Sequence, residues 1–194
     1  MLLALTPGPD VLLVVAIAAK EGFTKALQLT LGLASGVIVH TTLIILGFSA
    51  MISASPLAMK LIALFGAGYL IYLAWLTWRH RHDHLQLAED RPFPGSYYWR
   101  GVIMNISNPK VLLFFLALFP QFAVLDEPGY HLRIAVLGGL FILATLMVFG
   151  GLAWVMARTT QNIMQKPGFK LTMDWITMGI FVLLAGLLVY SVVR

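Results

Sequence analysis

Long apolar stretches separated by short polar turns dominate this chain of 194 residues. A helix that crosses a bilayer needs about 20 predominantly apolar residues, and the pattern provides six such stretches. The sequence therefore predicts an all-α, polytopic membrane protein with six transmembrane helices. Only five residues precede Thr6, so the first span is expected to be short on its N-terminal side. The expected spans cover residues 1–19, 26–52, 57–78, 101–122, 133–157 and 175–193.

Two polar segments interrupt this pattern at places where an ordinary span would be apolar. The first runs from Thr6 to Asp10 and contains Pro7, Gly8 and Pro9; the second runs from Asn105 to Lys110 and contains Asn108 and Pro109. Proline lacks a backbone donor and clashes with the preceding helical turn. We therefore expect helices 1 and 4 to be interrupted at these prolines, with backbone groups exposed at mid-depth.

The two breaks also belong to a short internal repeat. The five residues from Pro9 (Pro-Asp-Val-Leu-Leu) correspond to the five from Pro109 (Pro-Lys-Val-Leu-Leu), 100 positions later. This divides a single domain, 1–194, into a first repeat over about 1–78, a loop over 79–100 and a second repeat over about 101–194. Three spans per repeat is an odd number, so the repeats must be inverted, as in many secondary transporters.

Composition agrees with a membrane protein and leaves no cause to invoke nucleic acid. Hydrophobic residues make up 60% of the chain and charged residues 11%. In soluble domains about half of the residues are apolar and about a quarter are charged. The formal net charge of +5 is explained better by basic cytoplasmic loops than by a nucleic-acid partner. Without cysteine the chain has no disulfide and no thiolate metal site.

The distribution of charge predicts the orientation. Nine of the 13 Lys and Arg residues follow the first, third and fifth spans, and three lie on the other side. Cytoplasmic loops carry such an excess, so both termini are expected outside the cytoplasm. The nine are Lys20, Lys25, Arg79, Arg81, Arg91, Arg100, Arg158, Lys166 and Lys170, and the three are Lys60, Arg133 and Arg194. The tryptophans agree, because Trp75, Trp78, Trp99, Trp154 and Trp175 fall at the predicted cytoplasmic ends.

Asp10 and Lys110 carry opposite charges at equivalent positions of the repeat. A charge at mid-span costs roughly 2.5–3.5 kcal/mol on insertion scales, so each is expected to face a partner or a wet cavity. Two interpretations stay open. The residues form a structural ion pair that tethers the repeats, or they form a pair that opens to bind substrate groups or to release a proton.

Three further polar residues are candidates for the same site. His40, in the middle of the second span, is either a proton relay or, as we favour, a neutral imidazole hydrogen-bonded between helices. Asn105 and Asn108 line a site or satisfy the broken backbone. Helix N-termini favour a carboxylate and free carbonyls favour an ammonium, so the breaks suit a zwitterion such as an amino acid.

Other functional classes find little support. The chain lacks a phosphate-binding Gly-x-x-x-x-Gly-Lys-Ser/Thr loop and a His-Glu-x-x-His zinc motif. Ser35 and His40, five residues apart, match one helix face poorly, so we expect no enzyme, no catalytic residues and no cofactor. The alternating His80, His82 and His84 suggest either a metal-binding tract or, as we favour, a solvated loop, and we therefore assign no metal site.

Four motifs together resemble the LysE/RhtB family of bacterial inner-membrane amino-acid exporters. They span Thr6 to Asp10, Gly66 to Leu73, Asn105 to Lys110 and Leu118 to Phe122. The resemblance covers essentially the whole chain and implies export of amino acids driven by protons without ATP, and often a homodimer. In a bacterial inner membrane, the termini that the charge distribution places outside the cytoplasm would be periplasmic. The last motif favours the homoserine and threonine branch. The expected substrates are small neutral amino acids of the homoserine, threonine or leucine type; the alternatives are cationic amino acids and metal or toxic ions.

Overall fold

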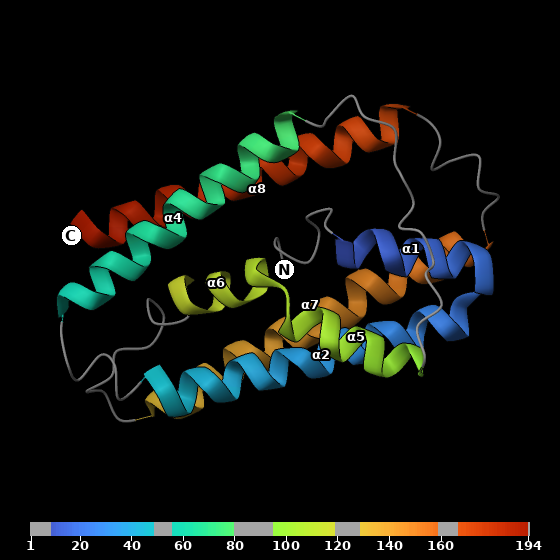
Figure 1. Cartoon of the computed structure of the whole chain (residues 1–194), viewed down its shortest axis with the longest axis horizontal. Helices are drawn as coiled ribbons and strands as arrows, with labels where there is room; N and C mark the ends of the chain where they lie inside the picture. The colour runs from blue at the N-terminus through green and yellow to red at the C-terminus, as the bar shows by residue number, and fades with distance from the viewer. Residues whose placement is uncertain (1–8, 49–55, 80–94, 119–128, 159–166, 194) are drawn as a thin grey trace.

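The computed structural model describes residues 9–48, 56–79, 95–118, 129–158 and 167–193, and within these ranges it contains helices and no strand (Figure 1). Within the described ranges, four helical stretches are long and apolar enough to cross a membrane: Phe23–Leu46, Lys60–Arg79, Tyr130–Arg158 and Asp174–Val193. The helices are α1 (Pro9–Glu21), α2 (Phe23–Leu43) with the π-helical turn η2 (Ile44–Phe48), α4 (Pro56–Arg79), α5 (Tyr97–Ile106), α6 (Pro109–Leu118), α7 (Tyr130–Arg158) and α8 (Pro167–Val193).

This architecture matches the expected polytopic helical protein, with differences at the first and fourth spans. The second, third, fifth and sixth expected spans correspond to α2, α4, α7 and α8. The fourth is divided into α5 and α6, each of 10 residues. The first is represented by α1, which begins at Pro9; Pro7 and Gly8 lie outside the described residues. The six-span inverted repeat stays a prediction.

The helices pack as a four-helix group and a pair, with α6 between them (Figure 1). In the group, α2 packs against α1, α5 and α7, and α1 also packs against α7. The pair consists of α4 and α8. Helices at corresponding places in the two halves of the chain are therefore partners, since α2 meets α7 and α4 meets α8.

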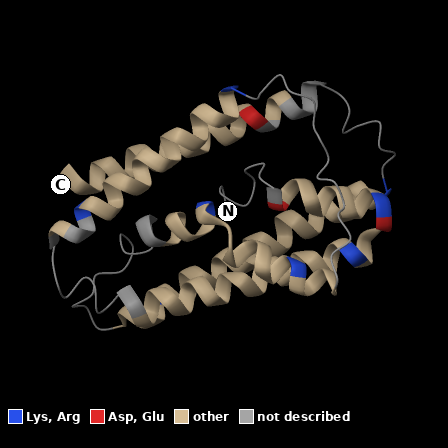
Figure 2. Ribbon diagram, viewed as in Figure 1, with Lys and Arg blue, Asp and Glu red and all other residues tan. Residues whose placement is uncertain are grey.

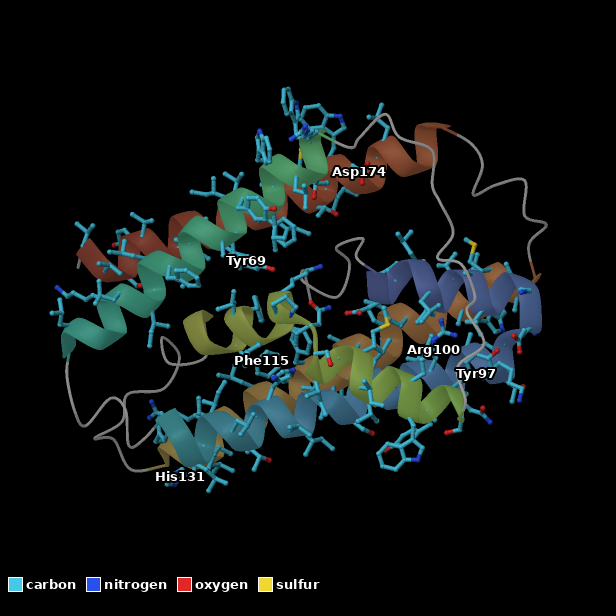
Figure 3. The ribbon with its side chains drawn as sticks, in the orientation of Figure 1. Tyr69, Tyr97, Arg100, Phe115, His131 and Asp174 are labelled. Atoms are coloured by element: carbon cyan, nitrogen blue, oxygen red, sulfur yellow. The ribbon has the colours of Figure 1, made fainter. Side chains whose placement is uncertain are left out.

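Two clusters of buried apolar residues hold this arrangement together. One lies where α1, α2 and α7 meet, and includes Val14, Leu29 and Ala153. The other surrounds α6 and takes residues from α2, α4, α7 and α8; Phe115 at its centre is completely buried. Figure 3 shows Phe115 on α6, between the group and the pair. Because α6 is packed within this second cluster, the break that precedes it lies in the interior.

Glycines allow α2 and α5 to approach each other closely. A Cβ on Gly32 would lie 1.9 Å from the backbone oxygen of Tyr98, and one on Gly101 would lie 2.2 Å from the backbone oxygen of Leu29. The Gly32-x-x-x-Gly36 spacing is typical of helices that pack closely through small residues. Gly68 on α4 has no such role among the described residues, because an added Cβ there would meet nothing within 4 Å.

Charged residues gather mainly near helix ends, as Figure 2 shows. In the last turn of α7 the guanidinium of Arg158 lies 4.2 Å from the ring centroid of Trp154. In the last turn of α4 that of Arg79 lies 5.3 Å from the ring centroid of Trp75. Such cation–aromatic pairs suit the boundary between lipid and water, where amphipathic rings accumulate. The side of the membrane on which these ends lie stays a prediction.

Candidate functional site

The fourth expected span is interrupted at Asn108. The side-chain oxygen of Asn108 accepts a hydrogen bond from the backbone N–H of Lys110 at 3.0 Å. The backbone N–H of Asn108 donates to the carbonyl of Asn105 at 3.1 Å. Asn108 thus caps α6, and Pro109 occupies the first helical position, where its missing N–H costs nothing. The Lys110 N–H, which would reach Ile106 in an unbroken helix, is used by the cap. The interruption expected from the proline is therefore present.

His40 on α2 lies against this break. In a continuous helix the N–H of residue 109 would donate to the carbonyl of Asn105, but Pro109 has none. His40 Nε2 lies 3.2 Å from that carbonyl oxygen. A carbonyl can only accept, so Nε2 carries a proton, and in the neutral ring Nδ1 is then an acceptor. The imidazole is 2% exposed, and its ring centroid lies 5.7 Å from that of Phe115.

Asp10 is joined to the break by Asn108. The carboxylate, in the first turn of α1 and 9% exposed, accepts a hydrogen bond from Asn108 Nδ2 at 2.8 Å. Its position near a helix N-terminus also favours a negative charge. This bond connects residues 98 positions apart, one from each expected repeat.

Lys110 completes the group. It interacts electrostatically with Asp10, and its Nζ lies 5.2 Å from the ring centroid of Phe181 on α8. We call Asp10, Asn108 and Lys110 the polar cluster. The opposite charges that the sequence places at equivalent repeat positions are thus close enough to interact, within a surrounding of apolar and aromatic side chains.

Several buried polar atoms near the break have no hydrogen-bond partner among the described residues. They are Oδ1 of Asp10, Nδ1 of His40 and Oδ1 of Asn105; the hydroxyl of Tyr130, at the start of α7, also has no partner among the described residues. Buried polar atoms are usually hydrogen-bonded, so such a set calls for a donor from elsewhere. The first three are all acceptors. Chemically, the break can therefore receive a donor-rich group such as an ammonium or a water molecule.

The candidate residues fall into three classes by position. Asp10, Asn108 and Lys110 form the polar cluster, which Pro109 joins through the backbone. His40 and Asn105 meet one turn earlier, where α2 crosses α5. Pro9 begins α1, and Pro7 and Gly8 lie outside the described residues, as do His80, His82 and His84 of the loop.

One buried acid escaped the sequence analysis. Asp174 immediately precedes the expected sixth span of 175–193, yet it lies inside α8 and is 7% exposed. Figure 3 shows it where α8 meets α4. Thr177, three residues later, is completely buried. This i, i+3 spacing puts both polar residues on one helix face, a signal that the sequence contained.

Replacing Asn108 should separate its two contributions. Asn108→Ala removes both the cap of α6 and the bond to Asp10, and loss of such a cap alone costs about 1 kcal/mol. Asn108→Ser retains a capping oxygen but is too short to serve Asp10 as well. We expect the melting temperature of the detergent-solubilised protein to fall in the order wild type, Ser, Ala. Equal melting temperatures for all three would contradict the assigned bonds.

The chain matches a known family over nearly its whole length. A family model described as a LysE type translocator matches residues 1–192. No solved structure matches the chain.

Named relatives share about a third or less of their residues with this chain. A homoserine/homoserine lactone efflux protein of Salmonella typhimurium (strain LT2) is 31% identical over 159 residues, covering 81% of this chain and 76% of the relative. A cysteine/O-acetylserine efflux protein of Escherichia coli (strain K12) is 27% identical over 198 positions, covering 100% and 92%. An uncharacterized membrane protein of Vibrio cholerae is 32% identical over 120 residues, covering 61% and 58%.

Proposed function

This chain belongs to the LysE family of translocators, and we propose that it exports small neutral amino acids across the bacterial inner membrane in exchange for protons. Two relatives are named for the efflux of homoserine and of cysteine or O-acetylserine. These names differ in the amino acid and agree in the type of process. They support a class of substrate, small amino acids and their close derivatives, rather than one compound.

The polar cluster is the observation that carries this proposal. Asp10 offers a carboxylate with one unused oxygen, which suits the ammonium of an amino acid. Lys110 lies in the first turn of α6, so its charge and the helix N-terminus both favour a carboxylate. A zwitterion set between these residues would satisfy both charges at once. The cluster is complementary to the part that all amino acids share.

The same pair accounts for coupling to protons. When no substrate is bound, Asp10 and Lys110 compensate each other; a zwitterion that enters must separate them and replace each partner. Protonation of Asp10 would then weaken its hold on the substrate ammonium and favour release. This scheme keeps the buried site close to electrically neutral in every state, which a low-dielectric surrounding requires.

The position of Lys110 favours neutral over cationic substrates. A second positive group on the substrate, or a metal ion, would add charge beside an ammonium whose partner Asp10 is already engaged. Repulsion between like charges is large where water is scarce. Cationic amino acids and metal ions are therefore the alternatives that the transport assay should exclude.

The proposal is tested by flux measurements in proteoliposomes. Vesicles are loaded with a panel of labelled amino acids, a pH gradient is imposed, and the wild type is compared with Lys110→Ala. We expect gradient-dependent flux of small neutral amino acids and its loss in the variant. Lys60→Ala, at an exposed lysine of α4, is the matched control and should behave as wild type. No gradient-dependent flux of any amino acid would refute the proposal.

A further inference from the structure

The carbonyl of Asn105 is the one acceptor that Pro109 deprives of its helical donor. Its partners in the structure include the N–H of Asn108 at 3.1 Å and Nε2 of His40 at 3.2 Å. A carbonyl oxygen has two lone pairs, so this atom is fully used. It is therefore not one of the groups that a substrate would meet, although an opened helix was expected to expose such carbonyls.

We infer that His40 is a positioning residue, which supplies from α2 the hydrogen bond that Pro109 cannot give and so holds the broken helix in the shape that forms the polar cluster. This inference rests on the proposed transport function for its activity test. His40 itself need not touch the substrate. It acts through Asn105, three residues before the Asn108 that joins Asp10.

The packing around His40 is built for such a contact. Gly36, one turn earlier on α2, would place a Cβ only 2.6 Å from Oδ1 of Asn105, so only glycine leaves room for that side chain. Phe115 lies against the imidazole from α6. The ring is thus held by one hydrogen bond to α5 and one aromatic contact to α6, the two helices that the break separates.

The role requires a donor at the Nε2 position and no change of charge. The imidazole contacts two uncharged groups, the Asn105 carbonyl and the Phe115 ring, while the charged groups of the break are Asp10 on α1 and Lys110 on α6. Nε2 carries its proton in the neutral tautomer that the carbonyl selects, and it would keep that proton if Nδ1 were also protonated. An uncharged donor of the right length should therefore be able to replace the histidine. If His40 were a proton relay, a side chain that cannot take up and release a proton could not replace it.

Two variants of similar polarity separate these roles. The amide nitrogen of glutamine lies about as far along the side chain as Nε2, whereas that of asparagine reaches only as far as Nδ1. We expect His40→Gln to transport within about threefold of wild type with the same pH profile, and His40→Asn to lose about tenfold or more in maximal rate, because a buried carbonyl loses its partner. Equal loss in both variants, or in neither, would overturn the inference.

A stability measurement distinguishes a failure of this inference from a failure of the proposed function. Pro109→Ala restores an N–H at residue 109 that can donate to Asn105. The fall in melting temperature caused by His40→Asn should then be smaller in the Pro109→Ala background than in the wild type. An equal fall in both backgrounds would overturn the inference without reference to transport. A smaller fall, combined with no amino-acid flux in the wild type, would leave His40 as the positioning residue and refute the proposed function.

Discussion

Asp10→Asn is expected to reduce gradient-driven amino-acid flux to background while the protein still inserts into the membrane. Asparagine preserves the size of the side chain and an oxygen that can accept from Asn108 Nδ2. It removes the negative charge that compensates Lys110, and with it the group we propose to bind the substrate ammonium. Leaving one member of a buried ion pair without its partner costs about 3–5 kcal/mol when that member stays charged.

A double variant resolves the two interpretations that the sequence left open. In Asp10→Asn with Lys110→Met, both charges are gone and the electrostatic penalty with them. If the pair only tethers the two halves, the double variant should regain flux together with stability. If the pair binds substrate, the double variant should regain stability but not flux. Melting temperature and flux are measured on the same preparations, and wild-type flux in Asp10→Asn would rule out the proposed role of the carboxylate.

The parts of this structure that depend on local chemistry could be predicted from the sequence. The helical stretches follow from runs of apolar residues, because a backbone in lipid must satisfy its own hydrogen bonds. The interruption before α6 follows from Pro109, whose missing donor acts on the adjacent turn. The meeting of Asp10 and Lys110 was suggested by their equivalent places in the repeat, since equivalent elements of a two-fold arrangement approach each other near its axis.

The parts that depend on tertiary contacts could not be predicted. Nothing near His40 in the sequence indicates that its partner is a carbonyl 65 residues away. Gly32 and Gly68 both lie in segments of small residues, yet only Gly32 meets a neighbouring backbone. Asp174 was missed for another reason: the polarity of 158–174 marks where the chain leaves the lipid, whereas α8 begins at Pro167 and continues through that boundary.

Gly32→Ala is expected to destabilise the protein strongly, and more than the corresponding change at Gly36, Gly101 or Gly138. The new Cβ would lie 1.9 Å from the backbone oxygen of Tyr98, closer than the 2.2 Å at Gly101, the 2.4 Å at Gly138 and the 2.6 Å at Gly36. A backbone atom cannot rotate away as a side chain can, so α2 and α5 must separate. Overpacking of this kind costs typically 1–3 kcal/mol, and here we expect about 3 kcal/mol.

This separation should also impair transport, because α5 carries Asn105 and ends at the break. Moving α5 away from α2 lengthens the contact between His40 Nε2 and the Asn105 carbonyl, on which the shape of the break depends. Gly139→Ala on α7 is the matched control: its Cβ would meet nothing within 4 Å, and alanine is the better helix former. The melting temperature in detergent and the flux in vesicles should both fall for Gly32→Ala. Both should stay near the wild-type values for Gly139→Ala. Equal behaviour of the two variants would show that the α2–α5 contact does not position the site.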